Sequence, residues 1–135
     1  MSLREIVHAD NSIWVEIAVF VLGGGAYGLM EIWFRGHTHW TMLVTGGACA
    51  LTLFYLREWL LAQPLAVGAL AGAVIITAYE LAVGLLVNVK FSWHVWDYSG
   101  QPGNVLGQIC PTFTAIWFVV CFLFLSGVRL LMHAV

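Results

Sequence analysis

The chain has 135 residues, of which 61% are hydrophobic and only 9% are charged, and its formal net charge at pH 7 is −2. A soluble globular domain carries roughly a quarter charged residues, so this composition excludes a water-soluble domain and predicts a polytopic membrane protein. The sequence has no basic run, and nucleic acid is therefore excluded as a partner. The three cysteines lie in or beside apolar runs, which favours packing roles over disulfides.

Four apolar runs are each long enough to cross a bilayer, which takes about 20 residues in a helix. The predicted spans cover residues 12–34, 41–61, 64–89 and 108–133. We therefore expect residues 1–135 to form a single transmembrane domain, an all-α bundle of four transmembrane helices. The first run is too long for the apolar core of a cleavable signal peptide, so we expect it to remain as a membrane helix.

The distribution of charges predicts how the bundle lies in the membrane. An even number of spans places both termini on one side, together with Arg4, Arg57 and Arg129, while Arg35 and Lys90 lie on the other side. This bias predicts cytoplasmic termini in a multi-pass protein of the plasma membrane. All tryptophans except Trp117 fall near predicted helix ends, where indole rings anchor helices at the membrane interface.

Each predicted span has one face of small or hydrogen-bonding residues. Gly24 and Gly28 share such a face in the first span, and Gln108, Thr112 and Ala115 share one in the fourth. Faces of this kind are how membrane helices pack closely, and they need no further function.

Two glutamates, Glu31 and Glu80, lie inside apolar runs. A carboxylate near the bilayer centre costs about 2.5–3.5 kcal/mol, so such a residue is normally functional or paired. Arg35 follows Glu31 by one helical turn, whereas Glu80 has no cation one turn away on its own helix. Because the first and third helices run in the same direction, we expect a buried Glu31–Arg35–Glu80 cluster with Asn88 above it. A proton-coupled site and a purely structural ion cluster both remain open.

The connector between the third and fourth spans, residues 91–107, is long, polar, aromatic and rich in turn residues. Long ordered loops of this kind tend to be functional. We expect the connector to fold back as a cap over the cluster, with an ordinary interfacial loop as the alternative. Five residues here are expected to contact a substrate or line its pathway. Four lie in the connector and one lies at the start of the fourth span: Trp96, Asp97, Tyr98, Asn104 and Gln108.

Histidines near the connector give no specific metal signature. His37 and His39, or His94 with Asp97, offer ligand atoms, but their spacing is not that of a known site. We therefore predict no metal and no cofactor.

The segments Trp96-Asp-Tyr-Ser99 and Pro102-x-Asn104-x-x-Gly107-x-Ile-Cys110, followed by Trp117, resemble the type IV ABC-transporter permease family of small bacterial membrane proteins. Glu80 in Ile-Ile-Thr-Ala-Tyr-Glu and the segment from Glu31 to Met42 fit the same pattern. The resemblance implies a transport-type protein of a bacterial cell membrane. The sequence contains no phosphate-binding Gly-x-x-x-x-Gly-Lys-Ser/Thr loop, so use of ATP would need a separate ATPase subunit.

Three functions remain under consideration. The favoured one is a permease-type component that binds a small solute or a proton at the Glu/Arg cluster. Because four helices alone enclose little space, we expect it to form a homodimer or larger homo-oligomer. The second is a membrane-embedded enzyme acting on a lipid or lipid-linked substrate through His94, Asp97 and Tyr98. The third is a non-catalytic scaffold or partner subunit.

Overall fold

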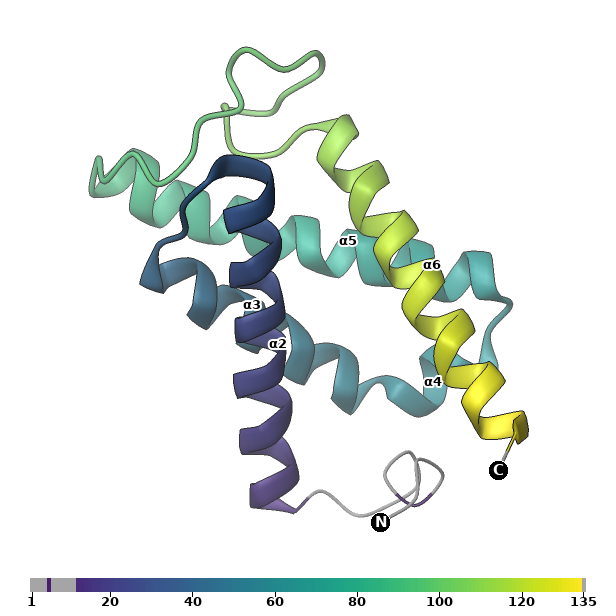
Figure 1. The fold of residues 1–135 in the computed structure, drawn as a ribbon. Helices are drawn as coiled ribbons and strands as arrows, with labels where there is room; N and C mark the ends of the chain where they lie inside the picture. Colours follow the sequence, from purple (N-terminus) through teal and green to yellow (C-terminus); the bar gives the residue numbers. More distant parts are fainter. Residues whose placement is uncertain (1–4, 6–11, 135) are drawn as a thin grey trace. The chain divides into compact units, whose positions relative to one another are not determined.

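The computed structural model describes residue 5 and residues 12–134, and this part of the chain is helical apart from its connecting segments (Figure 1). The prediction of an all-α protein is confirmed. The residues group into two compact units: the chain up to Ala62 together with the residues from Leu131, and the segment Gln63–Leu130. The expectation of a single transmembrane domain stays a prediction.

Three helices in the described part are long and apolar enough to cross a membrane: α2 (Ile13–Arg35), α5 with its continuation η1 (Leu65–Lys90), and α6 (Pro111–Ala134). Their bounds lie within three residues of the predicted first, third and fourth spans. A fourth apolar helix, α3 (Trp40–Tyr55), has 16 residues. At 1.5 Å per residue it is about 24 Å long, short of a hydrocarbon core of about 30 Å. A bundle of four spans therefore stays a prediction.

Both ends of α2 are capped by the residues that the sequence offers there. The Ser12 side chain accepts a hydrogen bond from the Trp14 backbone N–H at 3.3 Å. At the other end Gly36 adopts a left-handed conformation (φ 78°), and its N–H donates to the Ile32 carbonyl at 2.7 Å. Gly36 therefore caps the C-terminus of α2, and the polar segment after Arg35 begins with it.

The second predicted span is interrupted where the charged residues Arg57 and Glu58 follow Leu56. α3 ends at Tyr55, and a short helix, α4 (Arg57–Ala62), follows after Leu56. The Arg57 guanidinium donates to the Phe54 carbonyl at 2.8 Å and lies 4.1 Å from the centre of the Phe54 ring. This arginine satisfies a carbonyl that the helix end leaves open and contacts an aromatic face at the same time.

Within the first unit α2 and α3 cross in close contact at glycines (Figure 1). A Cβ atom added at Gly24 would lie 2.5 Å from the Leu43 carbonyl oxygen, and one added at Gly46 would lie 2.4 Å from the Tyr27 Cβ. The backbones approach each other because no side chain separates them, as in other close membrane-helix pairs.

In the second unit α5 (Leu65–Gly84) continues as a π-helix, η1 (Leu85–Lys90), and α6 crosses α5 (Figure 1). The Arg129 side chain near the end of α6 donates to the Gln63 carbonyl just before α5. This contact fixes the end of α6 at the start of α5, so the two helices run in opposite directions.

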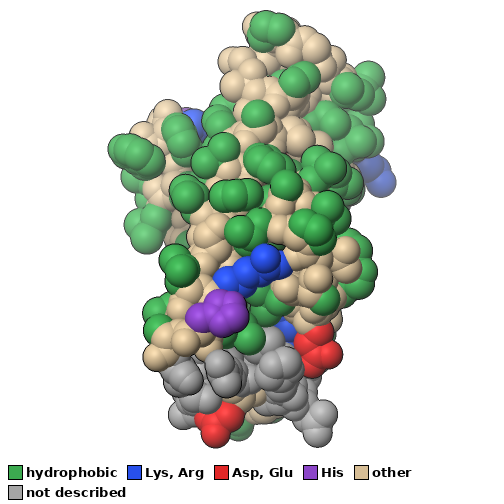
Figure 2. All heavy atoms as spheres, turned by 90° about the vertical axis from the view of Figure 1, so that its right-hand side faces the viewer, with side chains coloured by type: hydrophobic (Ala, Val, Ile, Leu, Met, Phe, Trp, Pro, Cys, Tyr) green, Lys and Arg blue, Asp and Glu red, His purple; other side chains and the backbone are tan. Residues whose placement is uncertain are grey.

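Large apolar side chains remain on the outer faces of the long helices. Leu22 in α2, Leu70 in α5 and Phe124 in α6 are 72%, 55% and 70% exposed. Hydrophobic side chains are scattered over the upper part of the face drawn in Figure 2, where charged ones are few. Such extensive apolar surface indicates contact with a membrane rather than with water.

Candidate functional site

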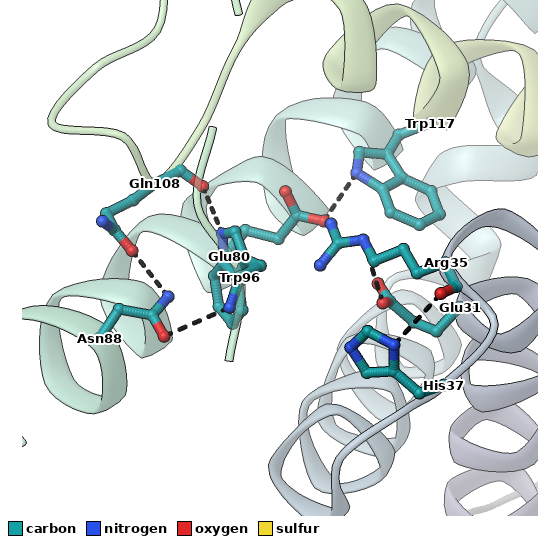
Figure 3. A network of polar contacts seen from close by, with 8 residues as sticks. All are labelled: Glu31, Arg35, His37, Glu80, Asn88, Trp96, Gln108 and Trp117. Carbon is teal, nitrogen blue, oxygen red and sulfur yellow. Dashed lines mark hydrogen bonds and ion pairs between the residues drawn. The ribbon is translucent and has the colours of Figure 1, made fainter. Parts of the chain in front are cut away.

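The most buried acidic residue of the described chain is Glu80, on α5. Its side chain is 2% exposed, and its Oε1 accepts a hydrogen bond from the indole N–H of Trp117, on α6, at 2.9 Å (Figure 3). Trp117 is itself buried. The carboxylate therefore faces protein rather than an open apolar surface, as its high cost in an apolar medium requires.

A second hydrogen bond joins the same two helices one turn away. The hydroxyl groups of Thr77 and Thr114 lie 2.9 Å apart, three residues before Glu80 and Trp117 respectively. These four residues form a group of polar contacts between α5 and α6, which we call the α5–α6 polar seam. Because the spacing is three residues on both helices, all four side chains lie on the facing sides of their helices.

The seam changes one sequence-based expectation for the fourth span. Gln108, Thr112 and Ala115 were expected to share the inward face, but Gln108 precedes the helix, and Thr112 and Ala115 are exposed. Gly107 takes a left-handed conformation (φ 70°), and Gln108 lies in a turn. The helix α6 therefore begins only at Pro111. The inward face is therefore set by Thr114 and Trp117.

A second network joins η1 to the connector. The Asn88 side chain donates to Gln108 Oε1 at 2.9 Å, while its own oxygen accepts the backbone N–H groups of Val95 at 2.7 Å and Trp96 at 3.4 Å (Figure 3). The Trp96 indole N–H donates to the Gln108 carbonyl at 3.0 Å. We call Asn88, Trp96 and Gln108 the connector lock. Trp96 and Gln108 are both 5% exposed.

Gly84 makes the lock sterically possible. A Cβ atom at this position would lie 2.9 Å from a ring carbon of Trp96 and 2.5 Å from Gln108 Oε1. The π-helix begins immediately after Gly84 and carries Asn88. π-Helical turns are rare and frequently occur at functional sites.

The middle of the connector is held by its own side chains. Asp97 Oδ1 accepts the Ser99 backbone N–H at 2.8 Å. The Asn104 amide donates to the Ser99 and Gln101 carbonyls at 3.1 and 2.9 Å, and its oxygen accepts the Gly107 N–H at 3.0 Å. Asp97 and Asn104 thus determine the path of the connector backbone.

The exposed carboxylate of Asp97 is stabilised in its charged form. Hydrogen bonds from Ser99 lower the pKa of Asp97 below its ordinary value, and the nearby His94 lowers it further. Tyr98, next in the chain, points the other way. It is 5% exposed and stacks on Phe113 with ring centres 4.6 Å apart and planes at 8°.

Glu31 and Arg35 form a separate ion pair in the first unit. Arg35 Nε lies 3.4 Å from Glu31 Oε2, one helical turn apart on α2. The His37 ring nitrogen lies 3.1 Å from the Arg35 carbonyl (Figure 3). The ion pair that the spacing predicted is present, whereas the cluster of these two residues with Glu80 stays a prediction because it joins the two units.

The structure brings several predicted residues together and adds others. Asn88, Trp96 and Gln108 contact one another, Asp97 and Asn104 shape the connector, and Glu80 accepts a hydrogen bond from Trp117. The site residues predicted from the sequence did not include Trp117, Thr77 or Thr114. The matching Thr-x-x-Glu and Thr-x-x-Trp spacings were the sequence signal that could have indicated these contacts. Among the described residues no group of three or more His, Cys, Asp or Glu could hold a metal ion.

The fold and the buried carboxylate define a class: a helical membrane protein with polar contacts between apolar helices. Within that class the chain belongs to the family described as "Putative ABC-transporter type IV", whose sequence model matches residues 28–135. The matched region contains Glu31, Glu80 and the whole connector. No curated protein and no solved structure shows significant similarity to the chain.

Proposed function

We propose that this protein is the membrane-embedded component of a transport system and that it binds a small solute or a proton at the α5–α6 polar seam. The observation that carries the proposal is the Glu80 carboxylate, buried on an apolar helix and bonded to Trp117. Membership of an ABC-transporter family supports the same function. Ionisable residues inside membrane helices commonly mark ion or substrate pathways.

The seam has the chemistry that such a site needs. Glu80 can carry a proton or pair with a cationic group, and the Thr77 and Thr114 hydroxyls can donate or accept hydrogen bonds. The connector lock lies at the far end of the same helix, where Gln108, Asn88 and Trp96 attach the connector to η1. We propose that this attachment, with Asp97, Tyr98 and Asn104 shaping the loop, controls access to the seam.

The surrounding architecture is part of the proposal. We propose that α3 and α4 together form the second of four spans, with both termini cytoplasmic in a bacterial plasma membrane. Because one chain encloses little space, we propose that a homo-oligomer forms the pathway and that a separate ATPase subunit supplies energy. The Glu31–Arg35 pair is proposed to contribute a second polar contact to the pathway.

Flux in reconstituted vesicles tests the proposal. Proton flux and the uptake of radiolabelled solutes are compared between the wild-type protein and Glu80→Gln, which keeps the shape of the side chain but removes its charge. Glu58→Gln is the matched control, since Glu58 is an exposed carboxylate in α4. We expect Glu80→Gln to lower flux at least tenfold and Glu58→Gln to leave it near the wild-type rate. Equal flux for the wild type and Glu80→Gln, with equal assembly in detergent, would overturn the proposal.

The contacts of Tyr98 and Asp97 do not favour the enzyme alternative. Tyr98 is buried against Phe113, and the Asp97 carboxylate is exposed and holds Ser99. The two side chains therefore do not converge on one point, as joint acid–base catalysis would require.

A further inference from the structure

A small group of exposed side chains lies where the span Leu65–Lys90 ends and the connector begins. It consists of Lys90, Phe91 and Trp93, and we call it the Lys90 group. Phe91 and Trp93 are 46% and 47% exposed, although both are large and aromatic. Neither belongs to the polar seam or to the connector lock, so the proposed transport site does not account for them.

The three side chains contact one another. The Phe91 and Trp93 rings are stacked, with centres 5.1 Å apart and planes at 26°. The Lys90 ammonium nitrogen lies 5.8 Å from the centre of the Phe91 ring, within the range of a cation–π contact. The group therefore combines two stacked aromatic rings with a positive charge over the Phe91 ring.

An unusual turn holds the two rings together. Ser92, between them, has φ 55°, a left-handed conformation that non-glycine residues adopt uncommonly. The Phe91 N–H donates to the Leu86 carbonyl at 3.1 Å, and the Trp93 N–H donates to the Val87 carbonyl at 2.8 Å. These bonds fix the turn on the end of η1, and the turn places alternate side chains against each other.

We propose that the Lys90 group is a binding site for a phospholipid headgroup at the membrane interface. Its position at the end of a membrane-spanning helix places it at the depth of the headgroups. Aromatic rings settle at that depth, and a lysine there extends its ammonium toward the lipid phosphates. The stacked rings lie against the glycerol region and the Lys90 ammonium pairs with the phosphate.

Tryptophan quenching tests where the group lies. The protein is reconstituted in vesicles that contain phospholipid brominated at a shallow or a deep acyl position, and iodide is added outside in parallel. The difference between the wild-type protein and Trp93→Phe isolates the emission of Trp93. We expect shallow bromines to quench this emission at least twofold more than deep bromines or iodide. Stronger quenching by iodide, or by deep bromines, would overturn the proposal.

Phospholipid retention tests the role of the charge. Lys90 is the only lysine of the sequence, so Lys90→Gln removes the chain's one primary side-chain amine. Native mass spectrometry of detergent-extracted protein counts the phospholipids that stay bound. An interfacial lysine contributes about 1 kcal/mol to contact with an anionic lipid surface, which is about a fivefold change in affinity. We expect Lys90→Gln to lose bound phosphatidylglycerol by about that factor and Lys90→Arg to keep it. Retention unchanged in Lys90→Gln would overturn the assignment of the phosphate site.

Substitutions at the turn separate this site from general folding. Ser92→Gly keeps the left-handed conformation accessible, and Ser92→Val disfavours it because valine is β-branched. We expect Ser92→Gly to retain lipid as the wild type does and Ser92→Val to lose it while flux in vesicles stays unchanged. Equal lipid retention in the two variants would contradict a site built by this turn.

Discussion

The indole N–H of Trp117 donates to the buried carboxylate of Glu80 at 2.9 Å, linking α6 to α5. The two residues are 37 positions apart in the chain, and Thr77 and Thr114, each one turn earlier on its own helix, are also hydrogen-bonded to each other. A polar pair between two apolar helices fixes their relative rotation, because any other rotation would leave the carboxylate in an apolar environment. The same pair is the one that we propose to bind the transported proton or solute.

Trp117→Phe removes the N–H donor and keeps an aromatic ring. Losing one hydrogen-bond donor to a buried acceptor costs about 1–3 kcal/mol, so we expect the free energy of unfolding in mixed detergent to fall by that amount. Trp33→Phe is the control, because Trp33 is 83% exposed. Thermal or denaturant unfolding measures both variants. A stability loss as large in Trp33→Phe as in Trp117→Phe would contradict the proposed importance of the hydrogen bond.

Gly84→Ala places a methyl group where the connector packs on α5. Its Cβ would lie 2.9 Å from the Trp96 ring, so the connector must shift, and we expect a loss of about 1–3 kcal/mol in stability together with faster proteolysis within residues 91–107. Gly25→Ala is matched to it, since nothing lies within 4 Å of a Cβ at Gly25. That variant is expected to keep or raise stability, because alanine is the better helix former. Equal behaviour of the two variants would show that the packing at Gly84 is not tight.

Asn88→Ala removes the side chain that accepts two backbone N–H groups of the connector. We expect hydrogen exchange at the Val95 amide, whose N–H donates to Asn88 at 2.7 Å, to accelerate at least tenfold. The Gln101 amide, which donates to the Tyr98 carbonyl within the connector, should change little. Mass spectrometry or NMR in micelles measures both sites. Unchanged exchange at Val95 would mean that Asn88 does not hold the loop.

The Ser99 hydrogen bonds lower the pKa of Asp97. The charged Asp97 side chain therefore stabilises the folded state fully above the ordinary aspartate pKa. This stabilisation is lost as the pH falls through the lower pKa of the folded state. A ¹³C-carboxyl titration of Asp97 should therefore give a midpoint below 3.8, the ordinary aspartate pKa. His94→Ala should move the midpoint upward by a smaller amount, since the charge of His94 is the lesser cause. A wild-type midpoint at or above 3.8 would contradict the hydrogen-bonded geometry.

The three long helices could be predicted from hydropathy and capping residues, and their bounds agree within three residues. The break at Leu56 was not predicted, because apolar residues resume after the charged pair Arg57 and Glu58, and the predicted span extended through that pair to residue 61. It depends on the Arg57 guanidinium turning back onto Phe54, a contact that hydropathy does not express. The α-to-π change after Gly84 was likewise not visible, since it depends on connector residues that are distant in sequence.

The sequence predicted one of the pairings at the site but not the contact between Glu80 and Trp117. The i,i+4 spacing was enough to pair Glu31 with Arg35, and burial of Glu80 followed from its apolar surroundings. Its partner Trp117 was recognised only as a deep tryptophan, because pairing across two helices requires their rotation to be known. Gln108 was assigned to a helix, although Gly107 before it and Pro111 after it mark the turn and the true start of α6.

Site-resolved modification of Glu80 by a hydrophobic carbodiimide, measured together with flux, tests the central claim most directly. Carbodiimides react with protonated carboxyl groups in apolar surroundings, and mass spectrometry of peptides distinguishes Glu80 from Glu31. We predict that flux falls in proportion to the fraction of Glu80 that carries the adduct, and that the transported solute or a raised external pH slows the modification. Full modification of Glu80 with undiminished flux would contradict a transport site at this carboxylate.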